Sequence, residues 1–125
     1  MKKLILFFIA FSLLATSCQT EKQEVTLGID LQNSFIGDKV EVSLDGEVVM
    51  NGFFTTNDLL GVCLPDGILR MKCLTGKHHI EVRINDTYYK QQKFIVQRDL
   101  YYAVRFDRIS GNITFIPFDE PFFYD

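Results

Sequence analysis

One stretch decides the fold because apolar and polar residues alternate in it without a break: His79-Ile80-Glu81-Val82-Arg83-Ile84. Successive side chains of a β-strand point to opposite faces, so this order gathers the apolar side chains on one face. Asn85 and Asp86 follow, and both residue types favour turns. The sequence therefore predicts a β-strand that buries one face and ends at a turn.

The same alternation recurs on both sides of this stretch. It places apolar residues at every second position in these further segments: Val25, Leu27, Ile29 and Leu31; Val40 and Val42; Val48 and Met50; Leu69, Met71 and Cys73; Tyr102, Val104 and Phe106; Ile113 and Phe115. Helical spacing of apolar residues is not sustained anywhere after Cys18. These short strands predict an all-β fold: a single antiparallel β-sandwich of about seven or eight strands, immunoglobulin-like or transthyretin-like.

Two turns set the expected strand pairing. We expect Leu44-Asp45-Gly46 to form a three-residue hairpin loop, because a two-residue Asp-Gly turn would oppose Val40 to the polar Asn51. The three-residue loop instead pairs Ser43 with Glu47, Val42 with Val48 and Val40 with Met50. Pro65-Asp66-Gly67 is expected to form a second hairpin loop, with Leu64 paired to Ile68 and Cys63 to Leu69.

The segment Tyr88 to Val96 alternates less cleanly. Lys90 and Gln92 share the parity of Phe94 and Val96. We therefore expect half of this strand to extend past the edge of the core.

The chain begins with a short apolar segment. Lys2 and Lys3 precede eleven residues, Leu4 to Leu14, that are all apolar except Ser12. Such a segment is too short for a membrane-spanning helix, which needs about 20 residues, and has the length of a signal-peptide core. The following Leu14-Ala15-Thr16-Ser17-Cys18 resembles a bacterial lipoprotein signal, in which small residues precede the lipidated cysteine. The alternatives are an ordinary cleaved leader, in which Cys18 is incidental, and an uncleaved anchor.

The lipoprotein resemblance implies a cellular location and a domain organisation. Residues 1–17 are then the signal peptide, residues 18–24 the lipidated Cys18 and a polar tether, and residues 25–125 the sandwich. Cys18 would hold the protein on the lipid bilayer of the cell envelope, because two or more acyl chains bind durably. Gln19 after the cysteine resembles the sorting signal for the outer membrane, facing the periplasm or the cell surface.

Charge excludes one class of partner. Removing the leader takes away Lys2 and Lys3, which leaves 11 basic and 16 acidic residues and a net charge of −5. Nucleic-acid binding needs a basic face, so we expect no nucleic-acid partner.

Three segments resemble the PEGA family and the related transthyretin-like and carboxypeptidase-regulatory-like modules. They are Val42-Ser43-Leu44-Asp45-Gly46-Glu47, the run from Leu74 to Val82 that contains Gly76-Lys77-His78-His79-Ile80, and Phe94-Ile95-Val96. The resemblance covers about residues 40–106. It implies a small, non-catalytic β-sandwich domain of the bacterial envelope, used for adhesion, scaffolding or ligand contact.

The candidate catalytic and metal-binding residues are few. His78 and His79 are neighbours on a predicted strand and point to opposite faces, so we expect no shared metal ion. Motifs for a serine nucleophile or a phosphate loop are missing from the sequence. We therefore expect a protein that is not an enzyme, with no metal site and no cofactor.

The remaining cysteines, Cys63 and Cys73, form an even pair in an oxidising compartment, which ordinarily suggests a disulfide. The predicted Pro65 hairpin separates them by about 13 Å, beyond the roughly 7 Å limit for a bridge. We expect free, buried thiols, unless the segment around Cys63 is a loop that folds back.

The C-terminal segment Pro117 to Asp125 crowds four aromatic residues beside three acidic ones. Two prolines make it a poor ladder strand, so we expect an extended tail at the sheet edge. One interpretation is that Phe122 and Phe123 fold back and close an open end of the sandwich. The other is that Phe122, Phe123 and Tyr124 contact a partner in the envelope, either a protein or a glycan.

Taken with the leader, these patterns predict a membrane-anchored envelope lipoprotein whose β-sandwich is a binding or structural module. The alternative is an accessory subunit or inhibitor of an envelope enzyme or transport complex.

Overall fold

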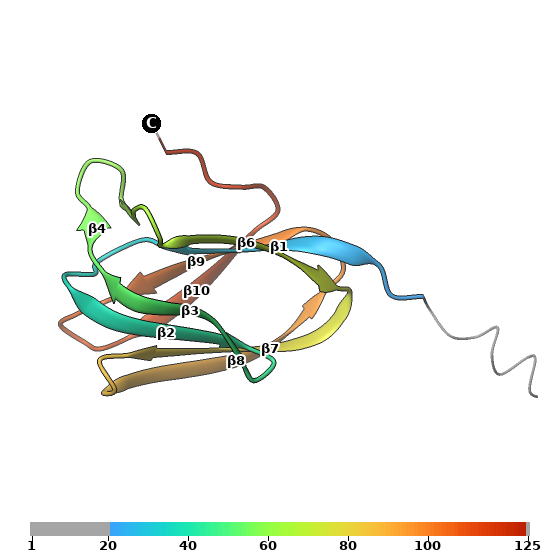
Figure 1. Cartoon of the computed structure of the whole chain (residues 1–125), viewed down its shortest axis with the longest axis horizontal. Coiled ribbons are helices and arrows are strands. Elements are labelled where there is room, and N and C mark those ends of the chain that lie inside the picture. The colour runs from blue at the N-terminus through green and yellow to red at the C-terminus, as the bar shows by residue number, and fades with distance from the viewer. Residues whose placement is uncertain (1–20, 125) are drawn as a thin grey trace, which may run out of the picture.

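Two four-stranded sheets face each other in the computed structural model, which describes residues 21–124 (Figure 1). The strands are β1 (Glu24–Leu31), β2 (Asp38–Leu44), β3 (Glu47–Phe54), β4 (Thr56–Asn57), β5 (Val62–Cys63), β6 (Ile68–Leu74), β7 (Gly76–Ile84), β8 (Tyr88–Val96), β9 (Leu100–Phe106) and β10 (Ile113–Phe118). The described residues contain no helix, so the predicted all-β sandwich is confirmed. The predicted signal peptide and Cys18 lie outside the described residues.

The strand count exceeds the expected seven or eight. Eight strands build the sandwich, and the two-residue strands β4 and β5 form a small ladder of their own in the loop between β3 and β6. A two-residue strand is too short to show any alternation, so the sequence carries no signal for it.

The first strand lies inside a sheet. Sheet A has the order β10-β9-β1-β6 and sheet B the order β3-β2-β7-β8. All ladders are antiparallel except that between β1 and β9, where Ile29 pairs with Tyr102 in parallel. An immunoglobulin domain pairs its first strand with its second, whereas here β1 and β2 belong to opposite sheets. Of the two expected arrangements, the immunoglobulin strand order therefore does not apply.

The predicted alternation places the core correctly. Ile80, Val82 and Ile84 of β7 are fully buried, and Arg83 between them is exposed. Across the sandwich, Leu27 and Ile29 of β1 are fully buried too and belong to the same cluster. The stretch that decides the fold thus supplies the centre of sheet B, and β1 supplies the centre of sheet A.

The β2–β3 hairpin corrects the expected register. Leu44 pairs with Glu47 around a two-residue Asp45-Gly46 turn, both of whose residues have positive φ. A bulge then restores parity, because Val42 pairs with Met50 while Ser43 pairs with Val48. The predicted three-residue loop is wrong, and so are its pairs: Val40 lies opposite Gly52 and Val48 is exposed.

The Pro65 turn does not join a hairpin either. Cys63 pairs with Thr56 in the β4–β5 ladder, while β6 pairs with β1. The predicted pairs of Leu64 with Ile68 and of Cys63 with Leu69 are therefore wrong. The triplet Pro65-Asp66-Gly67 predicts a turn, but it does not specify which strands pair on either side of that turn.

Both cysteines in the described residues are free, as expected. Cys63 packs against Gly67, whereas Cys73 lies six residues farther along β6, about 20 Å away at the rise of an extended strand. Cys63 is buried and Cys73 is half-buried. Burial raises the pKa of both thiols, so both stay protonated near neutral pH.

The first half of β8 lies at the edge of the core, as predicted. Lys90 and Gln92 are half-buried, whereas Phe94 and Val96 are buried. The Lys90 ammonium lies 5.4 Å from the centre of the Phe115 ring in the opposite sheet.

The sandwich has two distinct ends. We call the end at which β1 begins the proximal end; it carries the turn at Asp45-Gly46 and the connections at residues 75 and 97–99. The distal end carries the loops at residues 32–37, 55–67, 85–87 and 107–112. Figure 1 shows β1 starting at one side of the molecule and β4 projecting at the other.

Candidate binding surfaces

The C-terminal tail, residues 119–124, crosses the outer face of sheet A. The Tyr124 hydroxyl donates a hydrogen bond to Asp30 Oδ2 at 2.7 Å. Asp30 lies between the core residues Ile29 and Leu31, so its side chain points away from the core. The expected closure of an open end by Phe122 and Phe123 is wrong, because the tail covers a sheet face and leaves the Phe123 side chain 85% exposed.

The tail residues divide between two directions. The Phe122 ring is half-buried, with its centre 4.6 Å from that of Phe118 and 6.3 Å from that of Tyr124. Phe123 points to solvent between them. Of the three residues predicted as a partner contact, Phe122 and Tyr124 hold the tail in place, and Phe123 is presented outward.

A polar network built around the buried side chains of Asp30 and Gln32 lies beneath the tail. Asp30 is fully buried and forms an ion pair with Arg70 of β6. Gln32 Nε2 donates to the Tyr124 hydroxyl at 3.2 Å, and Arg105 Nε donates to Gln32 Oε1 at 3.0 Å. A buried carboxylate is costly unless it is paired and hydrogen-bonded, and here both conditions are met. The network therefore ties the tail to three strands of sheet A.

The Tyr124 hydroxyl can donate its hydrogen bond to Asp30 only while it is protonated. Burial, together with the hydrogen bond to the Asp30 carboxylate, raises the pKa of Tyr124 well above its ordinary value of 10. The phenol stays protonated at physiological pH and remains a donor to Asp30.

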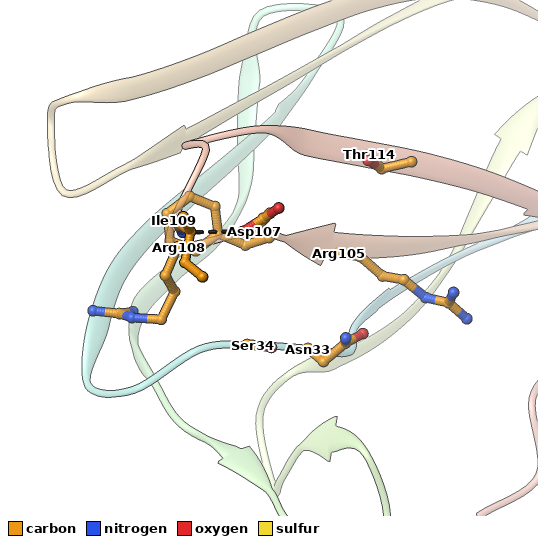
Figure 2. A pocket seen from close by; sticks show the side chains of 8 residues that line it. Asn33, Ser34, Arg105, Asp107, Arg108, Ile109 and Thr114 are labelled. Atoms are coloured by element: carbon orange, nitrogen blue, oxygen red, sulfur yellow. Dashed lines mark hydrogen bonds between the residues drawn. The ribbon is translucent and has the colours of Figure 1, made fainter.

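The distal end contains a hollow of about 450 Å³ (Figure 2). It is lined by Asn33, Ser34, Arg105, Phe106, Asp107, Arg108, Ile109 and Thr114. Figure 2 shows the Arg105 and Arg108 side chains extending in opposite directions. Arg108 donates to the buried Asp38, and Arg105 to Gln32, so both guanidinium groups are already engaged. The hollow offers polar contacts without a converging set of catalytic groups.

Exposed apolar side chains project from the loops around this hollow. Ile36 is 67% exposed, Leu59 is 93% exposed and Ile109 is fully exposed. They come from three separate loops, all at the distal end. We call Ile36, Leu59 and Ile109 the distal tips. They are single exposed apolar residues on loops, and loops on a rigid scaffold commonly carry binding residues.

The proximal end contains a histidine clasp formed by His78, Asp45 and Leu74. His78 Nδ1 lies 2.6 Å from Asp45 Oδ2, and Nε2 lies 2.5 Å from the Leu74 carbonyl oxygen. A carboxylate and a carbonyl oxygen only accept hydrogen bonds, so both imidazole nitrogens must donate. The arrangement therefore favours the doubly protonated, cationic ring.

Electrostatics agree with this assignment. Burial by itself lowers the pKa of His78, but the hydrogen bonds to Asp45 and Leu74 and the Asp45 charge together raise it above 6.5. Lys22 acts weakly in the opposite direction. Desolvation by itself raises the pKa of Asp45, but the hydrogen bonds from the His78 ring and from the His79 backbone N–H lower it below 3.8.

His79 takes a separate set of partners. Its Nε2 lies 2.9 Å from Gln91 Oε1, and its Nδ1 lies 3.6 Å from Glu81. Within residues 21–124 no three potential metal ligands gather at one point.

Sequence reasoning did not identify the buried acids Asp30 and Asp38. Asp30 has the parity of an outward-facing residue, and the tail, whose path the sequence does not specify, helps to cover it together with Arg70. Asp38 follows a turn glycine and reads as a surface loop residue. It is 2% exposed and accepts hydrogen bonds from Asn85 and Arg108.

No family model, curated protein or solved structure matches the chain. In the part of the chain that the structure describes, no helix is long and apolar enough to cross a membrane.

Proposed function

We propose that this protein is a lipid-anchored lipoprotein of the bacterial cell envelope whose β-sandwich binds a partner without catalysing a reaction. The leader and Cys18 support the anchor. β1 begins at Glu24, six positions after Cys18, so a short polar tether would hold the proximal end against the outer membrane.

The observation that carries the binding role is the position of the distal tips. Ile36, Leu59 and Ile109 lie at the end of the sandwich opposite the start of β1. An anchor at one end and exposed apolar loop residues at the other suit a module that presents its loops to a partner beyond the membrane surface.

The arrangement of the sheets supports the transthyretin-like resemblance over the immunoglobulin-like one. The first strand pairs with β6 and β9 inside one sheet, and the two sheets have four strands each. Small modules of this architecture are the class for which the resemblance implies adhesion, scaffolding or ligand contact.

The test compares two multiple variants of the full chain. Ile36→Ser, Leu59→Ser and Ile109→Ser remove the distal tips, while Val48→Ser and Ile95→Ser remove exposed apolar residues near the proximal end. Each protein is purified from detergent-solubilised membranes, and its co-purifying partners are quantified by mass spectrometry. We expect the distal variant to lose a stoichiometric partner that the proximal variant keeps.

Equal partner retention by both variants would contradict the distal surface. A partner lost selectively that proves to be an envelope enzyme would favour the alternative function, an accessory subunit or inhibitor. A structural protein or a glycan would favour the binding module.

A further inference from the structure

The sandwich has four edge strands, and three of them carry features that block further pairing. β10 contains Pro117, which has no backbone N–H to donate. β3 is bulged at Val49, between its pairs with β2. β8 turns the charged Lys90 toward the gap between the sheets. Bulges, prolines and inward-pointing charges are devices that protect edges from strand addition.

β6 is the fourth edge and lacks these devices. It pairs with β1 in an unbroken register of seven residues, from Ile68 opposite Asp30 to Leu74 opposite Glu24. It contains neither proline nor glycine, and within residues 21–124 its other side has no strand neighbour. An exposed, regular edge of this length is a template for another extended chain.

The side chains of β6 define what would fit beside it. Leu69, Met71 and Cys73 share the core-facing row and are only half-buried at this edge, although they pack against the core. A neighbouring strand with apolar residues at alternate positions would complete their burial.

The opposite row offers Lys72 as its available basic group. Lys72 is exposed and residues 68–74 contain no acidic side chain, whereas Arg70 in the same row is already ion-paired with Asp30. Lys72 Nζ donates to the neutral Thr26 hydroxyl at 2.9 Å and takes part in no ion pair within the described residues. Acidic residues on the added strand would face this row.

In the register that uses all seven residues of β6, a second copy of the chain fits this edge poorly. If the β6 strands of two copies pair antiparallel with Met71 opposite Met71, Arg70 of each copy lies opposite Lys72 of the other. Like charges directly opposite on neighbouring strands are destabilising.

We propose that the free edge of β6 binds an extended segment of a partner protein by strand addition, and that this segment alternates apolar with acidic residues. The surface is separate from the distal tips, so either one can be wrong without the other.

The experiment uses the peptide acetyl-Val-Glu-Val-Glu-Val-Glu-Val-amide and the full chain in detergent micelles. Hydrogen exchange is followed by mass spectrometry at peptide concentrations up to about 1 mM, the range of weak specific binding. We expect slower exchange of backbone amides in residues 68–74 and unchanged exchange in the β8 edge, residues 88–96. A matched peptide with Lys in place of every Glu should give no protection.

Charge reversal tests the chemistry of the site. Lys72→Glu should weaken peptide binding about three- to ten-fold, because an attractive cross-strand pair becomes a repulsive one. Lys93→Glu, at an equally exposed position on β8, is the control and should leave binding unchanged. The distal-tip variant should also bind the peptide normally.

Three results would overturn the proposal: no protection at the highest concentration, protection of β8 in place of β6, or equal binding of the Glu and Lys peptides. If Lys72→Glu fails to fold, Lys72→Gln gives the same comparison with a smaller expected effect.

Discussion

The Tyr124 hydroxyl completes the hydrogen-bond network on the outer face of sheet A. Tyr124 supplies one of the side-chain hydrogen bonds to the fully buried Asp30, and Arg70 supplies the ion pair. Removing a donor from a buried charged acceptor leaves part of its desolvation cost uncompensated. Tyr124 therefore belongs to the folded domain.

We expect Tyr124→Phe to lower the free energy of unfolding by about 1 to 2 kcal/mol, because the ring stays while the hydrogen bond to Asp30 is lost. Urea unfolding measures the change. Phe123→Ala is the control, since Phe123 is 85% exposed and should change stability little. Equal losses in the two variants would show that Tyr124 has no special contact.

His78 should make stability depend on pH. Its folded-state pKa lies above the ordinary 6.5, so the folded state holds the proton more tightly than the unfolded chain does. The extra stability is fully present below the unfolded pKa and is lost as pH rises through the folded pKa. We expect wild type to lose more stability between about pH 5.5 and 8.5 than His78→Gln does.

Urea titrations of both proteins at the two pH values give this difference. Gln is the useful replacement because it keeps a polar side chain that can still donate to Asp45. Parallel pH profiles in the two proteins would contradict the cationic clasp. Asp45 titrates well below this window, since its own pKa is lowered from 3.8.

At the scale of elements, β1 and β9 pack closely where Gly28 lies beside Tyr101. A Cβ at Gly28 would overlap the Tyr101 ring, which lies directly beside it on the outer face of sheet A. Glycine therefore lets Tyr101 lie flat against the sheet, with Arg70 5.2 Å from the ring centre.

Gly28→Ala should destabilise the protein by about 1 to 3 kcal/mol, the usual cost of overpacking. The double variant Gly28→Ala/Tyr101→Ala should cost less than the two single changes added together, because the clash needs both side chains. Gly52→Ala is the control, since its new Cβ would lie 3.5 Å from the nearest Phe54 atom. Thermal unfolding measures all four; additive effects of Gly28 and Tyr101 would contradict the clash.

Period-two alternation was sufficient to predict the main strands and their buried faces. Ile80, Val82 and Ile84, for example, are all fully buried as expected. The strand register was harder to predict, because the Asp45-Gly46 turn and the bulge beside Val42 have opposite effects on which residues of β3 face the core. The apolar pattern of a sequence shows which residues face the core after both irregularities have acted. It does not show where the turn and the bulge each lie.

The binding surfaces were less predictable for a related reason. Alternation reports which face of one strand is apolar, whereas Asp30 is buried by a tail far away in the sequence. The sequence marked Phe122, Phe123 and Tyr124 as candidates from composition alone, and only their packing separates the anchoring residues from the exposed one.

At the scale of the whole molecule, the anchor can be tested independently of the fold. We expect Cys18→Ser to move the protein from the membrane fraction to the soluble fraction or to leave its leader uncleaved, because no acyl chains can be attached. Fractionation followed by immunoblotting shows the location. For wild type, an intact mass equal to an unmodified mature chain would refute lipidation.

The position of β1 has a mechanical consequence. Any pull between a membrane anchor and a partner at the distal end acts along this strand, which pairs with β6 at seven positions and with β9 at five. Because the force would run along the strand and across the hydrogen bonds, both ladders would be loaded in shear, with all their bonds sharing the tension. A force at right angles to the strand would instead peel the ladder apart one bond at a time.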